Sequence, residues 1–325
     1  MIIAPILSII IPVYDTEHYI GDCLTSVFDQ DINESNYEVI CVDDCSPDKA
    51  VEIITEFQKS HENLSILKHS KNRGLGATRN TGLSAAKGKY VWFVDSDDIV
   101  RDNCFKEIIE CCEKNNLEIF HWAVMDDKFA MVYPVTELGV VSGVVDVVKG
   151  NNPYWFAWDR VYNREFLLNN NLWFSELKNG DILHTLSALN LAKRVMCCNI
   201  GYYYYRKDRP GSAMSTKSLS ATGTYKFSYL MGRELYHLST VMHPELSVVV
   251  LEHAKRQANS AARMSIKLPF REKLLFCKVI DKNLKNELWC ILNSSNKVVL
   301  SCPIVILFFH IPYLFVHFLR NLNKH

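Results

Sequence analysis

The first hundred residues alternate short apolar runs with stretches of helical spacing. Ile6–Val13 is a continuous, mostly β-branched run, which is typical of a strand buried on both faces of a parallel sheet. Glu17–Asp29 follows with apolar residues at helical spacing. Further strands are predicted at 37–42, 64–68 and 90–94, and further helices at 50–60 and within 74–86. This α/β alternation predicts βαβ units and a Rossmann-like, mainly parallel sheet flanked by helices.

The rest of the chain has a different pattern. Residues 116–150 are β-rich, 151–173 are aromatic and amphipathic, and Gly180–Ala192 is predicted to be a helix. Residues 216–296 indicate a helical C-terminal region, with turns near His243-Pro244 and Leu268-Pro269. We therefore predict an α/β domain over 1–215, a helical extension over 216–296 and an apolar tail over 297–325.

The tail has an uncharged stretch from Val298 to Leu319, 22 residues long and flanked by Lys297 and Arg320. A helix of that length would just span a bilayer. Two prolines and two histidines inside the stretch argue against a spanning helix, because lipid offers no partners for freed backbone groups. We expect a membrane-associating segment that lies in the membrane plane or inserts shallowly. A spanning helix and a buried or dimerising helix are the alternatives.

Composition and charge exclude some classes of function. The 36 basic and 36 acidic side chains balance, so nothing favours binding along a nucleic-acid backbone. The cysteines show no paired metal-ligand spacing, which favours buried thiols in a reducing compartment. The apolar N-terminal run lacks a preceding basic residue and is interrupted by Pro5 and Pro12, unlike a signal peptide. These features lead us to expect a cytoplasmic active site.

Polar residues follow each predicted strand of the first hundred residues. In parallel sheets such positions meet at the carboxyl edge, where ligands bind, so one ligand could contact all of them. The four clusters are Tyr14-Asp15, Asp43-Asp44, Arg73-Gly74 and Asp95–Asp98.

The aspartates at 95, 97 and 98 are the strongest candidate site. Three carboxylates at a strand end repel one another and need a cation, a set of donors or water. Mg²⁺ or Mn²⁺ suits such oxygen ligands and keeps coordination places for a diphosphate. The alternative is a turn followed by a helix cap.

Two further clusters carry candidate ligands. Asp43 and Asp44 offer acceptors for a nucleotide base or ribose, although Asp44 or Ser46 could instead cap the next helix. In the glycine-containing loop 72–80, Arg73 and Arg79 could contact phosphates or hold the aspartate cluster in place. A surface loop with solvated arginines is the alternative.

The ordered set of these motifs resembles glycosyltransferase family 2, the inverting family with the GT-A fold. The resemblance rests on Ser8–Tyr14, Val42–Asp48, Asn72–Gly82 and Gly88–Asp98, and extends loosely to residue 212. It implies that Pro12, Tyr14 and Asp43 line the nucleotide pocket and that Arg79 sits beside the nucleotide. It also implies that Asp95 and Asp97 form the metal-binding DxD motif, with Asp97 the more direct metal ligand and Asp95 nearer the ribose.

The second half of the sequence resembles the same family less closely. Ala157–Tyr162 resembles a W-x-K-L-Y segment, and Tyr204–Ser212 resembles a Y-x-Y-R…R-x-G-S loop that could fold over a diphosphate with Arg206 and Arg209. The family usually has Glu-Asp where this chain has Gly180-Asp181, and in the family the Asp is the catalytic base. The resemblance therefore implies that Asp181 is the base here, with Gly180 in place of the Glu.

The resemblance implies transfer of a sugar from a nucleotide-diphosphate donor, with UDP favoured, to a hydroxyl acceptor. The acceptor is expected to be a saccharide or lipid-linked saccharide in cell-surface polysaccharide synthesis, reached from the inner face of the cell membrane. Two alternatives stay open. One is a membrane-attached nucleotide-sugar-binding protein with impaired catalysis, which Gly180 supports. The other is a sugar nucleotidyltransferase, which would usually have a Gly-rich loop after its first strand.

Overall fold

The computed structural model describes residues 4–126, 128–149, 155–175, 180–207 and 221–266. It divides into two compact units, Met1–Arg209 and Pro210–His325. Each unit is described by itself.

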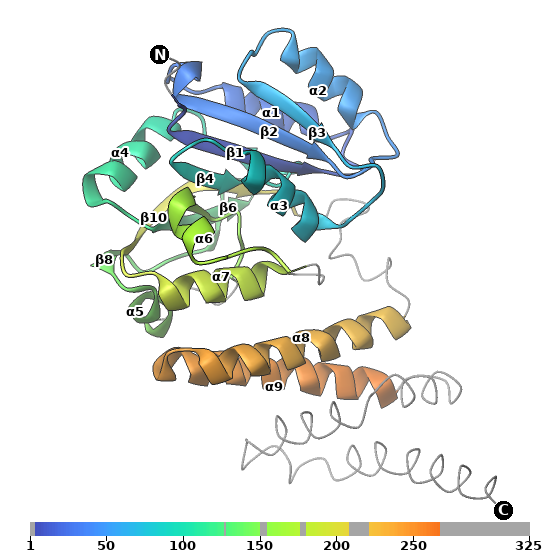
Figure 1. The fold of residues 1–325 in the computed structure, drawn as a ribbon, viewed down its shortest axis with the longest axis vertical. Coiled ribbons are helices and arrows are strands. Elements are labelled where there is room, and N and C mark those ends of the chain that lie inside the picture. The colour runs from blue at the N-terminus through green and yellow to red at the C-terminus, as the bar shows by residue number, and fades with distance from the viewer. Residues whose placement is uncertain (1–3, 127, 150–154, 176–179, 208–220, 267–325) are drawn as a thin grey trace, which may run out of the picture. The chain divides into compact units, whose positions relative to one another are not determined.

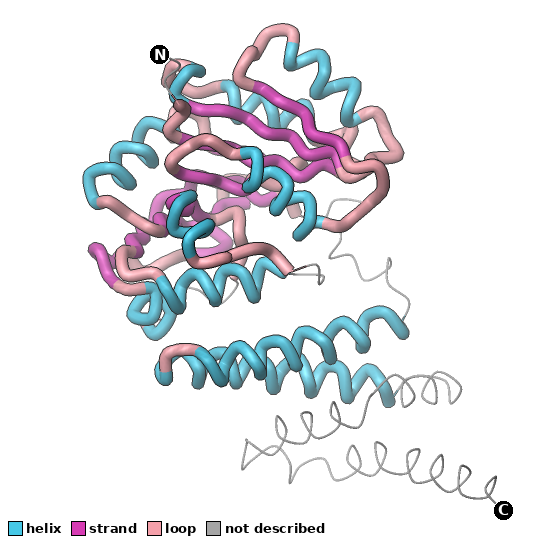
Figure 2. The backbone as a smooth tube through the Cα atoms, viewed as in Figure 1, coloured by secondary structure: helices cyan, strands magenta, loops and turns pink. Residues whose placement is uncertain are grey.

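The N-terminal unit is built on one mixed sheet, seen in Figures 1 and 2. The strand order is β3-β2-β1-β4-β9-β6-β10-β5, with β7 beside β6 and β8 beside β10. The strands are β1 Leu7–Val13, β2 Tyr37–Asp43, β3 Leu64–Lys68, β4 Tyr90–Phe93, β5 Ile99–Val100, β6 Ile119–Asp126, β7 Met131–Tyr133, β8 Leu138–Val141, β9 Arg160–Asn163 and β10 Val195–Tyr205.

Seven α-helices accompany the sheet in the described part of this unit. They are α1 Ile20–Phe28, α2 Ala50–Gln58, α3 Leu75–Ala85, α4 Phe105–Asn115, α5 Gly143–Val148, α6 Arg164–Asn169 and α7 Gly180–Leu191. Helix α4 was not predicted, although Phe105, Ile108, Ile109 and Cys112 repeat at helical spacing and are all buried. The predicted strands and helices of the first hundred residues are confirmed, with ends shifted by a few residues.

Strand direction explains how distant residues reach one edge of the sheet. Strands β1 to β4 pair in parallel, and β9 is antiparallel to both β4 and β6. Strand β6 therefore runs in the same direction as β4, and β10 pairs with β6 in parallel. The ends of β1, β2, β4, β6 and β10 consequently lie at the same edge, which is where the sequence predicts a ligand site.

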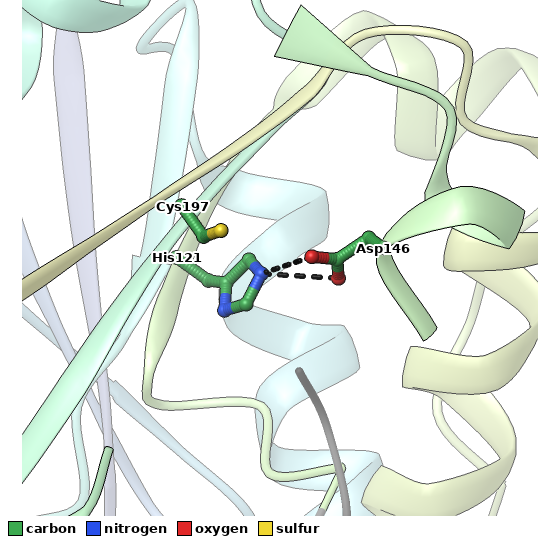
Figure 3. Close-up of side chains that lie close together, drawn as sticks. All are labelled: His121, Asp146 and Cys197. Atoms are coloured by element: carbon green, nitrogen blue, oxygen red, sulfur yellow. Dashed lines mark hydrogen bonds and ion pairs between the residues drawn. The ribbon is translucent and has the colours of Figure 1, made fainter. Parts of the chain in front are cut away.

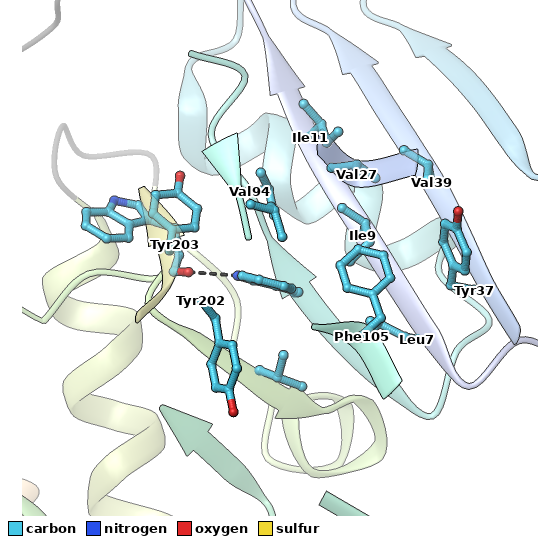
Figure 4. Close-up of a cluster of buried hydrophobic side chains, with 14 of the residues drawn as sticks. Leu7, Ile9, Ile11, Val27, Tyr37, Val39, Val94, Phe105, Tyr202 and Tyr203 are labelled. Carbon is cyan, nitrogen blue, oxygen red and sulfur yellow. Dashed lines mark hydrogen bonds between the residues drawn. The ribbon is translucent and has the colours of Figure 1, made fainter. Parts of the chain in front are cut away.

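The core lies against this sheet and is rich in aromatic residues, as Figure 4 shows. All seven residues of β1 are buried. Trp92 meets Trp122 edge-on at 4.8 Å between ring centroids, and Tyr203 stacks on Trp158 at 4.6 Å. Burying each large apolar side chain contributes about 1.5–3 kcal/mol. β4 and β10, which end at the carboxyl edge, both supply rings to this cluster, so the aromatic core packs against the strands that carry the candidate site.

The described part of the C-terminal unit is a helical hairpin of α8 Ala221–Val241 and α9 Pro244–Ile266. Met231 and Leu235 of α8 are buried four residues apart, as are Leu246, Val250 and Ala254 of α9, so each helix has an apolar stripe at helical spacing. The predicted turn near His243-Pro244 is confirmed, and the one at Leu268-Pro269 lies outside the described residues. Over the described residues, no helix is both long and apolar enough to cross a bilayer. The predicted tail, 297–325, lies outside them as well.

Candidate active site

A buried arginine joins two carboxylates that are far apart in the sequence. The Arg79 side chain is fully buried on α3. It donates from Nη1 to Asp181 Oδ1 at 2.6 Å and from Nη2 to Asp95 Oδ1 at 2.7 Å. Its guanidinium also faces the Phe174 ring, 5.2 Å from the centroid. Arg79 thus contacts the aspartate cluster at Asp95, which is one of the two roles considered for it, and the alternative of a solvated side chain is wrong for this residue.

Asp95, Asp97 and Asp98 form the predicted cluster directly after β4. Each offers a carboxylate oxygen, and these atoms lie within 4.8 Å of one another. Burial raises the pKa of Asp95 to about 6, with Arg79 lowering it and the neighbouring Asp97 and Asp181 raising it further. Burial and the neighbouring Asp97 and Asp95 also raise the pKa of Asp98 well above its usual range. Such a cluster suits a divalent cation, because a cation removes the repulsion.

Asp98 is held differently from its two neighbours. Its side chain accepts a hydrogen bond from the Tyr203 hydroxyl at 2.7 Å and another from the Arg206 backbone N–H at 2.8 Å. The Tyr203 oxygen also accepts the Asp95 backbone N–H at 3.1 Å. The third carboxylate therefore ties the aspartate turn to the end of β10. This contact could not be found from the sequence, where Tyr203 is one of four consecutive tyrosines.

Asp44 holds the glycine-containing loop in place. Its buried carboxylate accepts the backbone N–H groups of Arg73 and Gly74 at 2.8 and 2.7 Å and faces His69 Nδ1 at 2.7 Å. Gly74 has φ 86°, a left-handed conformation that favours glycine. Asp44 thus has a structural role, because its carboxylate holds the backbone of the loop at Arg73 and Gly74. The alternative that Asp44 or Ser46 caps α2 is wrong, because Glu17 accepts the Lys49 N–H and Asp48 accepts the Ala50 N–H at the start of that helix.

The remaining predicted nucleotide residues lie at the end of β1 and β2. Pro12 is buried within β1, whereas Tyr14 is 46% exposed just beyond it. Asp43 is buried at the end of β2 and accepts the Ser46 backbone N–H at 2.9 Å. These three residues and Asp95 lie at or just beyond the ends of neighbouring parallel strands, so the sheet brings them to the same edge.

Of the two arginines predicted on the diphosphate loop, one can be placed. Arg206 follows β10, donates from Nη2 to Asp22 at 3.1 Å and lies 5.0 Å from the Tyr19 ring centroid. It therefore stands near the aspartate turn, through its backbone bond to Asp98. Arg209 lies outside the described residues.

A second group of metal-type side chains comes from β6, α5 and β10 and is shown in Figure 3. His121, Asp146 and Cys197 are buried, and His121 Nε2 lies 3.1 and 3.0 Å from the two Asp146 oxygens. Cys197 donates to the Thr136 carbonyl, and burial raises the pKa of its thiol to about 12. A ligating histidine normally passes its second ring N–H to a partner. His121 Nδ1 is buried with no partner among the described residues, so we assign this cluster to the core.

The architecture matches solved structures. The structure of Staphylococcus aureus TarS 1–349 in complex with UDP-GlcNAc aligns with TM-score 0.66 and 24% identity, over 84% of this chain and 79% of that one. The mannosyltransferase PcManGT of Pyrobaculum calidifontis, in complex with GDP-Man and Mn²⁺, aligns with TM-score 0.57 and 14% identity, over 89% of this chain and 86% of that one. The fold is therefore of the GT-A class, as predicted.

Sequence comparison shows which proteins this chain is similar to. Residues 8–132 match the model of glycosyl transferase family 2. The chain is 33% identical over 215 residues to an uncharacterized glycosyltransferase, EpsJ, of Bacillus subtilis, covering 63% of this chain and 62% of that protein. It is 30% identical over 212 residues to a poly(ribitol-phosphate) beta-glucosyltransferase of Bacillus spizizenii, covering 64% of this chain and 33% of that protein. The chain thus matches less than two thirds of the length of these relatives.

Proposed function

We propose that this protein is an inverting glycosyltransferase that moves a sugar from a UDP-sugar to a hydroxyl of a saccharide acceptor. The observation that carries the proposal is the Arg79 bridge, since one fully buried guanidinium holds Asp95 and Asp181 together. These are the two carboxylates that the family resemblance assigns to donor binding and to base catalysis. The two carboxylates lie 16 and 102 positions from Arg79 in the sequence, and an ordinary surface ion pair would not require the arginine to be buried between them.

Asp181 is suited to accept the proton of the acceptor hydroxyl. Among the described residues, Arg79 alone hydrogen-bonds its carboxylate, and it uses Oδ1, so the second oxygen remains for the acceptor. A positioned general base of this kind contributes about 10²–10⁴-fold to a rate. As the acceptor oxygen attacks the anomeric carbon, the bond to the nucleoside diphosphate breaks on the opposite side. One displacement of this type inverts the configuration at that carbon.

The aspartate turn fits a divalent cation, Mn²⁺ or Mg²⁺, by its oxygen donors and their mutual repulsion. Asp97 and Asp95 would hold the ion, while Asp98 stays bonded to Tyr203. When bound, the ion offsets negative charge on the departing diphosphate. Arg206, tied to the same turn through its backbone, would add positive charge there, and Pro12, Tyr14 and Asp43 would contact the nucleoside.

The names of the relatives support the choice of substrates. TarS was solved in complex with UDP-GlcNAc and is named a poly(ribitol-phosphate) beta-N-acetylglucosaminyltransferase. We therefore propose that this protein acts in the synthesis of a cell-surface polysaccharide.

The proposed enzyme is tested by donor hydrolysis. We expect the purified chain to release UDP from a UDP-sugar in the presence of Mn²⁺ and not after chelation. Asp181→Asn should lower the rate by about 10²–10⁴-fold while keeping Mn²⁺-dependent UDP binding. Asp102→Asn, at an exposed aspartate, is the matched control and should behave as wild type. UDP binding without hydrolysis in wild type would favour the binding-protein alternative. Joining a sugar phosphate to a nucleotide would favour the nucleotidyltransferase.

The membrane association is a separate proposal that rests on the uncharged stretch 298–319. A lipid-linked saccharide would be within reach of a site held at the membrane surface. Removing residues 297–325 should release the protein from membranes on sedimentation. If the shortened chain pellets as fully as the intact one, the stretch is not the anchor.

A further inference from the structure

The carbonyl of Ser175 lies between two glycines from different helices. A Cβ atom added to Gly76 of α3 would lie 2.2 Å from Ser175 O, and one added to Gly180 of α7 would lie 2.6 Å from the same atom. Both distances are shorter than real Cβ contacts, and both meet backbone, which cannot swing aside. Neither glycine has a positive φ, so space and not backbone conformation requires them.

The same segment is fastened to α3 by a two-sided hydrogen bond. The Asn80 side chain donates from Nδ2 to the Phe174 carbonyl at 2.9 Å, and its Oδ1 accepts the Phe174 backbone N–H at 2.8 Å. The Phe174 ring faces the Arg79 guanidinium, which lies 5.2 Å from its centroid, and stacks on the His184 ring at 3.9 Å. Phe174-Ser175 is thus packed against α3 on one side and α7 on the other.

These contacts set the distance between the two helices that carry the site. Arg79 lies one turn after Gly76 on α3, and Asp181 follows Gly180 directly in the first turn of α7. Arg79 bonds Asp181 at 2.6 Å and Asp95 at 2.7 Å, so a displacement of α7 would lengthen or break the bond from Arg79 to Asp181. A side chain at position 180 would have to move either Ser175, and with it the Asn80 contact, or the start of α7.

We propose that Gly180 is a positioning residue. Because it has no side chain, α7 can pack closely against the Ser175 carbonyl and so against α3, and this close packing keeps Asp181 hydrogen-bonded to Arg79. The inference rests on the proposed function, because it takes Asp181 as the base. It reverses the expectation from the family resemblance, where Gly180 stands in place of Glu and raises doubt about catalysis. In this chain a carboxylate at position 180 is harmful.

The test compares glycine substitutions in the full-length protein. Gly180→Ala and Gly180→Glu are matched with Gly139→Ala, because a Cβ at Gly139 of β8 meets nothing within 4 Å. The measurements are kcat and KM for UDP-sugar turnover and the Kd of UDP with Mn²⁺. We expect both Gly180 variants to lose at least tenfold in kcat, Glu more than Ala, with the Kd of UDP within about threefold of wild type. Gly139→Ala should match wild type in all three.

A second variant covers the case in which the Gly180 proteins do not fold. Asn80→Asp keeps the acceptor for the Phe174 N–H but places a carboxylate oxygen against the Phe174 carbonyl. It should lower kcat at least tenfold with an unchanged UDP Kd. The inference is overturned if Gly180→Glu equals or exceeds wild type, if UDP binding falls in parallel with kcat, or if Asn80→Asp matches wild type. Inactive wild-type protein would instead count against the proposed function.

Discussion

The hydroxyl of Tyr203 donates to the carboxylate of Asp98 at 2.7 Å, and this bond connects the end of β10 to the aspartate turn after β4. The same hydroxyl oxygen accepts the backbone N–H of Asp95. One buried side chain therefore sets both the first and the last aspartate of the turn. The position of the proposed metal ligands depends on a residue that contributes no ligand.

Replacing Tyr203 with Phe should loosen the turn. The change leaves a buried Asp98 oxygen without its donor, which costs about 1–3 kcal/mol of folding stability. We expect that loss in urea unfolding, together with a weaker dependence of UDP binding on Mn²⁺. Tyr204→Phe is the control, since no hydrogen bond of the Tyr204 hydroxyl is found among the described residues. Unchanged Mn²⁺ dependence in Tyr203→Phe would show that the turn holds its shape without this bond.

Replacing Arg79 with Lys should separate the two carboxylates. One ammonium cannot reproduce the two N–H bonds that a planar guanidinium makes to Asp95 and Asp181. Breaking a buried ion pair typically costs about 3–5 kcal/mol. We expect a stability loss approaching that range by urea unfolding and a fall in kcat of about tenfold or more. Arg256→Lys, on the exposed side of α9, should change neither; an Arg79→Lys enzyme with wild-type kcat would contradict the role given to the bridge.

Replacing Asp44 with Asn should free the glycine-containing loop. An amide offers one acceptor oxygen where the carboxylate serves two backbone N–H groups and His69. The amides of Arg73 and Gly74 should then exchange hydrogen at least tenfold faster, as measured by NMR or mass spectrometry. Asp31→Asn, at an exposed position, provides the comparison. Equal protection of both amides in the two variants would mean that other contacts hold the loop.

His184 gives the protein a specific sensitivity to acid. Burial, with the nearby positive charges of Arg79 and Arg160, lowers the pKa of His184 to about 3. Its unfolded-state value is about 6.5, so the unfolded chain takes up a proton first as the pH falls. The contribution of His184 to stability is therefore complete above about pH 6.5 and falls by about 1.4 kcal/mol per pH unit toward pH 3.

Replacing His184 with Phe removes this titration, and the aromatic neighbours Phe174, Phe93 and Tyr162 can accept the ring. Urea unfolding at pH 7 and pH 5 should show wild type losing about 2 kcal/mol more than His184→Phe over that interval. Parallel losses in the two proteins would mean that His184 is protonated in the folded state.

The sequence predicted the first half of the fold well, because short β-branched runs and helical spacing are local signals. It also placed Asp43, Asp95 and Asp97 at one sheet edge, since parallel strands bring their carboxyl ends together. It did not predict the Arg79 bridge to Asp181 or the bond between Tyr203 and Asp98, which join residues about a hundred positions apart. Gly180 was recognised as a departure from the family, but its reason depends on Ser175, a contact that no spacing rule reveals.

The central claim is that the aspartate turn and Asp181 belong to one metal-dependent active site. Anomalous diffraction from crystals grown with MnCl₂ and UDP tests it most directly. The account predicts a manganese peak bonded to Asp97 and to the UDP phosphates, with Asp181 still paired to Arg79 beside it. A UDP molecule bound elsewhere, or at this edge with no manganese on the aspartates, would contradict the account.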